Sequence, residues 1–268
     1  MIRIGTSGWA YPEWRGAFYP SDLPQRRQLA HLAERLSTVE INGSFYSLQR
    51  PTSYQNWAAQ VPGDFCFAVK GGRFITHLKQ LRDPEIPLAN FFASGVLALG
   101  DKLGPVLWQL PATLSFDVDR IAEFLALLPR STTAAAELAN RHSDVLPADR
   151  TWLAVDQDRP VRHAIEVRHE SFRSEVFSDL LRANDIALVA SDSPRTWPYF
   201  EEITASFGYF RLHGHTELYA SGYSGRSLDG WAATIRDWAR QGDVYVYFDN
   251  TAKGHAPRDA ENLADLVL

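Results

Sequence analysis

The sequence predicts a single domain, residues 1–268, with the fold of a (β/α)8 TIM-type barrel and a helical and loop excursion between its fourth and fifth strands. Three observations lead to this α/β fold class. Short apolar runs of strand length alternate with amphipathic helical stretches, which favours parallel strands joined by crossover helices. The strand-like runs come to eight, the number that closes such a barrel. No linker, internal repeat or low-complexity tract marks a second domain.

The predicted elements follow one another as strand and then helix. The strands are residues 2–6, 38–42, 65–70, 106–110, 163–168, 186–191, 209–213 and 244–249. The helices are residues 25–36, 54–59, 88–99, 118–128, 174–183, 228–240 and 256–267. The strands are rich in β-branched and aromatic residues, whereas the helices show apolar residues with a period near 3.6. Pro257 falls in the first turn of the last helix, where its missing N–H costs nothing.

Two stretches interrupt the alternation. Residues 129–162 contain Pro147 and Pro160 and form the predicted excursion between strands four and five. The residues after strand six, SDSPRTWPYFEEITA, carry little helical periodicity. A doubly wound open sheet is the alternative architecture, but no G-x-G-x-x-G motif follows the first strand.

The composition limits the classes of partner. A chain of 268 residues with 45% hydrophobic residues can bury a sizeable core, and its net charge of −5 does not favour nucleic acid as a partner. The single cysteine, Cys66, lies in an apolar run, so we expect a core residue and a reducing cytoplasm. There is no signal-peptide pattern and no apolar run of about 20 residues, so we expect no membrane partner. The oligomeric state stays open.

Polar side chains share one face of six predicted strands. Because side chains alternate across a strand, Val39 and Ile41 on one face leave Glu40 and Asn42 on the other. The same alternation turns inward Lys70, Gln109, Glu166, Arg168, Tyr209, Arg211, His213, Tyr245, Tyr247 and Asp249. They lie toward the carboxyl ends of their strands, the face where barrel enzymes carry their active sites. Burying this much charge is costly, which indicates a function.

The same charges also have a purely structural interpretation. The three anions Glu40, Glu166 and Asp249 could neutralise the three cations Lys70, Arg168 and Arg211 as a buried network. Glu40, Glu166 and Arg211 each lie two residues deeper than the last inward group of their strand, so we expect a supporting layer. We favour a counter-charge role for Glu40, with Asn42 as the residue that meets the ligand.

Two loops have the composition of phosphate sites, and a divalent metal is a further alternative. The candidate phosphate-binding residues are Gly222, Ser224, Gly225, Ser227, Lys253 and Gly254, which precede two predicted helices. Glycine and serine also make ordinary turns, so both interpretations stand. Glu40, Glu166, His213 and Asp249 are ligand types for Mg²⁺, Mn²⁺ or Zn²⁺, although no H-x-H, H-E-x-x-H or D-x-D motif supports a metal. The sequence therefore requires no cofactor.

Long motifs carry a family resemblance. They are GTSGWAYPEWRGAFYP (5–20), TVEINGSFY (38–46), FAVKGGRFITH (67–77), LGPVLWQLP (103–111), AIEVRHESF (164–172), YFRLHG (209–214) and VYVYFDNTAKGHAPRDA (244–260). Over nearly its whole length the chain resembles the YecE-like family, a domain of unknown function numbered seventy-two. The resemblance implies a TIM-type barrel related to sugar isomerases and supplies no reaction. The family usually has Asn-Asn where this chain has Asp249-Asn250, and Arg where it has Ser47.

Together, these patterns predict an enzyme that acts on a small polar or anionic substrate, such as a phosphorylated sugar, by acid–base isomerase or lyase chemistry. His213, Glu166 and Glu40 are the candidate catalytic acids and bases. The candidate substrate-binding residues are Asn42, Lys70, Arg73, His77, Gln109, Arg168, Arg211, Tyr247, Asp249 and Asn250. Two alternatives stay open: a metal-dependent phosphodiesterase or nuclease, and a non-catalytic protein that binds nucleic acid or a metabolite.

Overall fold

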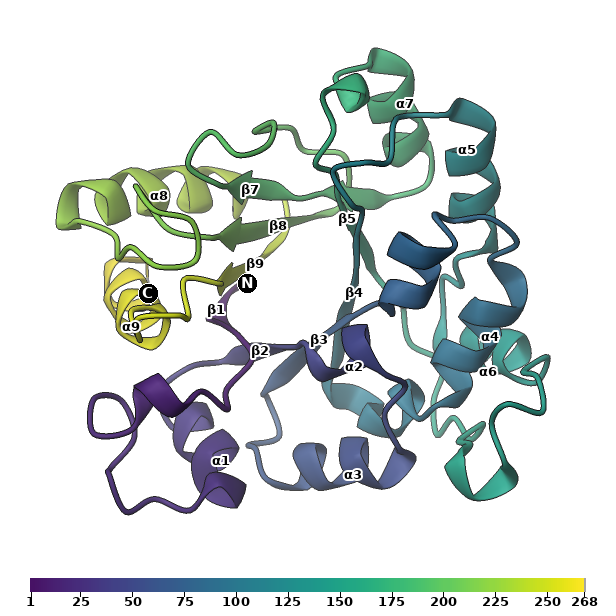
Figure 1. Cartoon of the computed structure of the whole chain (residues 1–268), viewed down its shortest axis with the longest axis horizontal. Coiled ribbons are helices and arrows are strands. Elements are labelled where there is room, and N and C mark those ends of the chain that lie inside the picture. The colour runs from purple at the N-terminus through teal and green to yellow at the C-terminus, as the bar shows by residue number, and fades with distance from the viewer. Residues whose placement is uncertain (268) are drawn as a thin grey trace. The chain divides into compact units, whose positions relative to one another are not determined.

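The computed structural model describes residues 1–267, which Figure 1 traces from purple to yellow. Contacts divide them into two compact units. We call residues 1–40 together with 187–267 the terminal unit, and residues 41–186 the middle unit. That the whole chain behaves as one domain stays a prediction.

The terminal unit is built on a parallel sheet. Its strands are β1 (Ile2–Ser7), the first three residues of β2 (Thr38–Ile41), β7 (Ala190–Asp192), β8 (Phe207–Leu212) and β9 (Asp243–Phe248). Strand β1 pairs with β2 and β9, β9 pairs with β8, and β8 pairs with β7, all in parallel. The strands are buried along most of their length, as expected for a parallel sheet that helices cover.

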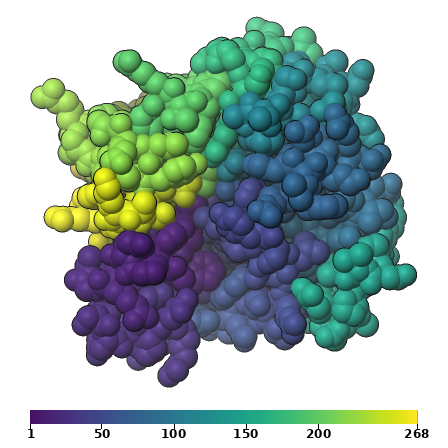
Figure 2. All heavy atoms as spheres, in the orientation of Figure 1, coloured from purple at the N-terminus to yellow at the C-terminus, as the bar shows by residue number. Residues whose placement is uncertain are grey.

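Helices pack on the strands of this unit. They are α1 (Gln28–Ala33), α8 (Gly225–Trp238) and α9 (Ala256–Val267), with short 3₁₀ helices at Pro12–Trp14 and Gln25–Arg27. Helix α9 contacts α8, β1 and β9, and α8 begins where the Ser224 hydroxyl accepts the backbone N–H of Ser227. Figure 2 shows the yellow C-terminal segment directly against the purple N-terminal segment. Both ends of the chain therefore contribute to one core.

The middle unit has its own parallel strands, β3 (Cys66–Lys70), β4 (Leu103–Gln109) and β5 (His163–Glu166), and ends at the first residue of β6 (Ile186–Leu188). Its α-helices are α2 (Gly43–Tyr46), α3 (Pro51–Ala59), α4 (Glu85–Ala93), α5 (Val118–Leu127), α6 (Thr132–Ala139) and α7 (Glu175–Ala183). A π-helix spans Phe74–Leu78, and 3₁₀ helices span Val96–Lys102, Ala148–Arg150 and Glu170–Phe172. Helix α5 matches the helix expected at residues 118–128, and α6 lies within the predicted excursion, residues 129–162.

Trp108 organises the core of the middle unit. Its indole ring lies so close to Gly71 that a Cβ there would be 2.3 Å from Trp108 Cε3, which explains the glycine. The indole N–H donates to His163 Nδ1 at 3.1 Å, and His163 Nε2 lies 2.7 Å from the carbonyl oxygen of Pro129. His163 therefore carries its proton on Nε2 and satisfies both partners as a neutral ring. Burial lowers its pKa to about 3.

Several predicted elements begin or end a few residues from their observed bounds, and two differ in kind from the structure. The single strand expected at residues 186–191 is two strands, β6 and β7, with Val189 between them, so the described residues hold nine strands in place of eight. All these residues are buried, and their hydrophobic pattern carries no mark of the interruption. The single helix expected at residues 88–99 ends at Ala93, because Gly95 adopts a left-handed conformation with φ 118° and restarts the chain as a 3₁₀ helix.

Within residues 1–267, none of the helices has both the length and the apolar composition that crossing a lipid bilayer demands.

Candidate functional site

A buried group of polar side chains lies at the carboxyl ends of the terminal unit's strands. We call it the Arg211 cluster, and its members are Ser7, Glu40, Tyr209, Arg211, His213 and Asp249. Ser7 ends β1 in register with Glu40 on β2, while Asp249 directly follows β9. The side chains of Glu40, Arg211 and His213 are fully buried. The alternation rule thus brings Glu40 and Arg211 together as predicted.

Glu40 is the acceptor at the centre of this cluster. Its Oε1 accepts from the Ser7 hydroxyl at 2.6 Å and from Arg211 Nη2 at 2.8 Å. Its Oε2 accepts from the Tyr209 hydroxyl at 2.8 Å and from Arg211 Nε at 3.1 Å. Burial and the charge of Glu40 raise the pKa of Tyr209 well above its usual value, which keeps its proton available for donation. Four donors compensate a carboxylate that is fully buried.

Asp249 connects this pair to His213. Its Oδ2 accepts from Arg211 Nη2 at 3.0 Å and lies 3.0 Å from His213 Nδ1. The His213 ring is edge-on to the rings of Trp197 and Tyr219, with distances between ring centres of 5.3 Å and 5.4 Å. The Asp249 side chain is 14% exposed, whereas those of Glu40, Arg211 and His213 show no exposure. Asp249 is therefore the charged member of the cluster that reaches the surface.

A second polar network of the terminal unit surrounds Tyr223. Its hydroxyl donates to Asp192 Oδ2 at 2.8 Å, and its backbone N–H donates to Asp259 Oδ2 at 3.1 Å. The amide of Asn250 also donates to Asp259 Oδ2, at 2.8 Å, and to the carbonyl oxygen of Ser221. Burial raises the pKa of both carboxyl groups. Asn250, predicted to bind substrate, is fully buried and holds two loops together.

The loops predicted to bind phosphate belong to the same unit. The Ser224 hydroxyl caps α8, and Ser227 Oγ lies 3.3 Å from His215 Nδ1. Lys253 Nζ forms an exposed ion pair with Glu217 at 2.8 Å. The backbone is left-handed at Gly254, with φ 75°, whereas Gly222 lies beside the His255 ring and Gly225 opens α8. Phosphate binding by these residues stays a prediction.

The middle unit carries a second charged group, which we call the His77 cluster: Lys70, Arg73, His77, Glu166 and Arg168. Lys70 is the last residue of β3 and Glu166 the last residue of β5. Arg73 directly precedes the π-helix, and His77 lies within it. Arg168 places Nε and Nη2 each 2.7 Å from Oε1 of the fully buried Glu166. A buried carboxylate thus fixes the orientation of this guanidinium.

His77 lies among the cations of this cluster. Its ring contacts Phe45 edge-on at 5.1 Å, and Lys70 Nζ lies 4.5 Å from the centre of the same Phe45 ring. Burial and then the charges of Lys70, Arg168 and Arg73 lower the pKa of His77 to about 4, against the opposing effect of Glu166. The imidazole is therefore neutral at pH 7, with Nδ1 2.9 Å from the Thr76 hydroxyl.

The remaining predicted ligand residues occupy three different environments. Gln109 on β4 stands in register with Glu166 on β5 and is almost fully buried. Asn42 is half-buried at the start of α2. Tyr247, in the terminal unit, is fully buried, and its hydroxyl pairs with Thr38 Oγ1 at 2.8 Å. As for a metal, no set of three or more His, Cys, Asp and Glu side chains in residues 1–267 is arranged to hold one.

Comparison with known proteins identifies the family. The sequence model of a family described as "Protein of unknown function DUF72" matches residues 3–268. The chain belongs to the DUF72 family. The UPF0759 protein YunF of Bacillus subtilis is 22% identical over the whole chain and 95% of its own length. The UPF0759 protein YecE of Escherichia coli K12 is 30% identical over 130 residues, 48% of this chain and 45% of YecE, so the matched stretch spans under half of that relative.

Solved structures place this DUF72 protein in its fold class. A DUF72 family protein from Thermotoga maritima is 25% identical, covers 100% of this chain and 99% of its own, and superposes with a TM-score of 0.78. D-psicose 3-epimerase from Clostridium cellulolyticum H10, at 13% identity, covers 99% of this chain and 98% of its own with a TM-score of 0.50. These likenesses confirm the α/β barrel and a fold resembling that of sugar epimerases.

Sequence reasoning did not single out several residues of this DUF72 protein that the structure places in its networks. Ser7, Asp192, Tyr223 and Asp259 each bond a buried polar group, yet none was proposed for the site. For Ser7 a signal existed, because it ends the first strand and the same alternation of side chains that selected Glu40 applies there. For Asp192, Tyr223 and Asp259 the bonding partner is distant in the sequence, and no local sequence pattern indicates the contact.

Proposed function

We propose that the protein is an enzyme that binds a small anionic substrate, with the size and charge of a sugar phosphate, at the His77 cluster and converts it by acid–base isomerase or lyase chemistry. The observation that carries this proposal is that His77 and Lys70 contact the same Phe45 ring, while the charges of Lys70, Arg168 and Arg73 act on the half-buried imidazole and lower its pKa. Such an arrangement suits an anion, because a substrate phosphate or carboxylate would offset charges that burial makes costly.

The three cations differ in mobility, which supports a binding role. Arg168 is held by Glu166, and Lys70 is almost fully buried against Phe45, so both present their charge from a fixed direction. Arg73 is exposed at the start of the π-helix and can follow an entering ligand. Two preorganised donors and one adaptable donor fit recognition of an oxyanion.

Acid–base chemistry has candidate groups in each unit. In the middle unit, His77 is neutral at pH 7 and can accept or deliver a proton, while the charges of Lys70 and Arg168 favour an enediolate over its protonated form. In the terminal unit, Asp249 reaches the surface and lies against His213, a pairing that can also take up and release a proton. Glu40, with four donors on its oxygens, fits the counter-charge role.

Substrate binding is tested by a thermal-shift screen of phosphate, sugar phosphates, hydroxy acids, nucleotides and RNA at two salt concentrations. We expect stabilisation by a small anion in the wild-type protein, a loss of most of that shift in Arg73→Gln, and no loss in Arg182→Gln, which removes an exposed charge from α7 of the same unit. Equal responses of the two variants would remove the His77 cluster as the anion site. A shift with RNA alone would favour a nucleic-acid-binding protein.

The chemistry is tested separately with any anion that binds. In D₂O, an isomerase or lyase that abstracts a proton beside a carbonyl group exchanges that proton for deuterium, which NMR detects in the ligand. We expect exchange in the wild-type protein and its loss in His77→Asn with binding retained. Binding without exchange in the wild-type protein would contradict the enzymatic role, and exchange that persists in His77→Asn would show that His77 is not the group that transfers the proton.

A further inference from the structure

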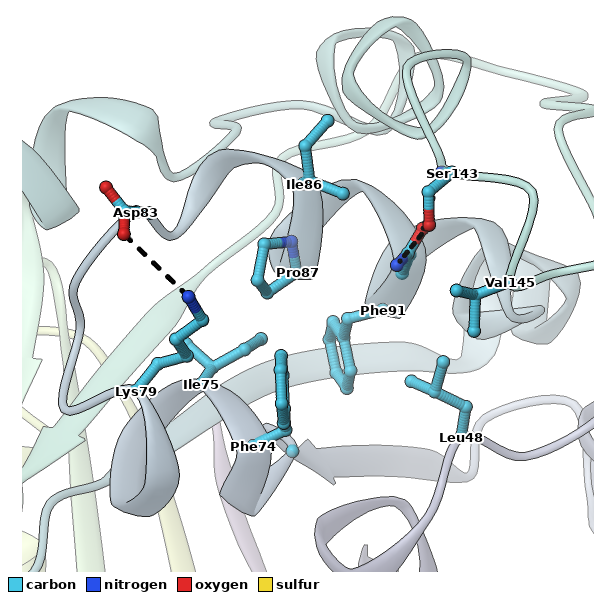
Figure 3. Close-up of a pocket in the computed structure, with 12 residues that line it drawn as sticks. Leu48, Phe74, Ile75, Lys79, Asp83, Ile86, Pro87, Phe91, Ser143 and Val145 are labelled. Atoms are coloured by element: carbon cyan, nitrogen blue, oxygen red, sulfur yellow. Dashed lines mark hydrogen bonds and ion pairs between the residues drawn. The ribbon is translucent and has the colours of Figure 1, made fainter.

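The middle unit contains a cavity that belongs to neither charged cluster. It has a volume of about 530 Å³ and lies between the π-helix, α4 and the loop around Val145. In Figure 3, Phe74, Ile75, Phe91 and Leu48 point toward the same space. Cavities of this size hold small organic molecules. His77, on the same π-helix, is not part of the lining, so this cavity is distinct from the proposed anion site.

The polar residues that line this cavity are matched to one another. Asn90 donates to Ser143 Oγ at 3.1 Å and accepts from the Ser143 backbone N–H at 2.8 Å, so the polar edge on that side is satisfied. On the other side Lys79 and Asp83 face each other at 3.8 Å and cancel in charge (Figure 3). A ligand in this cavity therefore needs no charged or strongly polar group to satisfy the lining.

The apolar lining reaches the surface. Phe74 is 52% exposed, Ile86 is 45% exposed and Val145 is 75% exposed, although large apolar side chains gain free energy when they are covered. A single exposed residue of this kind needs no explanation, but these three border one cavity. An apolar molecule bound in the cavity would therefore cover these three exposed side chains.

The backbone beside the cavity is strained. The π-helix Phe74–Leu78 is followed by Gln80, Leu81 and Asp83, whose φ angles of 50°, 64° and 43° lie in the left-handed region. Leu81 is nevertheless buried, so its conformation is held by packing. Single π-turns and clustered left-handed residues other than glycine are costly and occur mainly at ligand sites and clamps. This observation is independent of the lining.

We propose that this cavity binds an uncharged apolar small molecule, with an aromatic or branched aliphatic body that packs between Phe74 and Phe91. The ligand would cover the exposed rim and bury apolar area without uncovering a paired polar group. Its neutrality follows from the mutual pairing of all four polar side chains in the lining, Lys79, Asp83, Asn90 and Ser143.

The proposal is tested by fluorescence titration of the full chain with N-phenyl-1-naphthylamine, an uncharged apolar probe, and by competition with indole. The key variant is Val145→Trp, which extends a ring from the exposed rim into the cavity. Its matched control is Val176→Trp, an exposed valine on α7 of the same unit and outside the lining. Circular dichroism and the melting temperature establish that both variants fold.

We expect saturable binding of one probe per chain, weakened at least about tenfold by Val145→Trp, the factor that corresponds to 1.4 kcal/mol, and unchanged by Val176→Trp. Non-saturable binding, or equal affinity in the two variants, would overturn the proposal. A second probe with an anionic sulfonate tests the ligand class, and tenfold tighter binding of that probe would show that the class is wrong. The molecular mass of the protein is measured during the titration to test whether a second copy of the chain fills the cavity. A dimer that excludes the probe would assign the cavity to that second copy.

Discussion

Replacing Arg211 with methionine tests the interpretation of the Arg211 cluster. The substitution keeps an unbranched apolar side chain in the space but removes three hydrogen bonds to carboxylates, two to Glu40 and one to Asp249. Glu40 would keep the hydroxyl donors of Ser7 and Tyr209 and lose the guanidinium that is paired with it. A fully buried carboxylate would then lose this opposite charge.

The magnitude follows from that burial. Removing one partner of a buried ion pair costs about 3–5 kcal/mol, because the other charge stays in a medium of low dielectric constant. For a chain of this size the melting temperature falls about 2–4 °C per kcal/mol, so we expect a decrease of roughly 6–20 °C. The matched control is Arg35→Met in the same unit, whose ion pair with Glu261 is exposed at 3.2 Å and is worth at most about 1 kcal/mol.

A double substitution supplies a second readout. Without Arg211 the buried charge of Glu40 loses its partner, so removing that charge should restore stability. Urea unfolding should show that Glu40→Gln in the Arg211→Met background recovers part of the loss. A loss no larger than that of Arg35→Met, or one that the second substitution deepens, would refute a charge pair as the basis of the cluster.

Three further predictions concern the middle unit. The His77 imidazole should titrate with a midpoint near 4 in NMR spectra, and a midpoint near 6.5 would show that neither burial nor the surrounding cations perturb it. Burial lowers the pKa of His163 to about 3, so the stability that its neutral ring contributes is lost as the pH falls from about 6.5 toward that value. Urea unfolding should therefore show that His163→Gln loses less stability than the wild type between pH 7 and pH 4. Gly71→Ala should destabilise by about 1–3 kcal/mol because its Cβ meets Trp108, whereas Gly63→Ala, with open space around it, should not; equal unfolding midpoints would contradict this.

The two clusters share a chemical logic. In each, a fully buried glutamate pairs with an arginine. Glu40 accepts two hydrogen bonds from Arg211, whereas Glu166 accepts one from Arg168 Nε and forms an ion pair with its Nη2. A guanidinium held this way loses little conformational entropy when it meets an anion. The cluster around Arg211 also contains Asp249, a carboxylate that reaches the surface.

Some of the site was accessible from sequence because strand geometry is periodic. Glu40 and Arg211 occur in runs that alternate with buried apolar residues, and parallel strands bring their carboxyl ends to one edge, so their contact could be predicted without coordinates. The π-helix was not visible in this way, because FITHL has the composition of an ordinary helical turn. The break at Val189 was hidden for a similar reason, since its neighbours are apolar whether or not the ladder is interrupted.

The sequence by itself determined the α/β barrel class, the order of its strands and helices, and the inward position of the charged residues, because each depends on local periodicity and hydrophobic burial. Only the tertiary structure decided the remaining contacts. Tyr223 bonds Asp192 and Asp259, and apolar side chains from separate segments border one cavity. These are contacts between residues far apart in the chain, where side-chain direction and packing, rather than local propensity, set the distance.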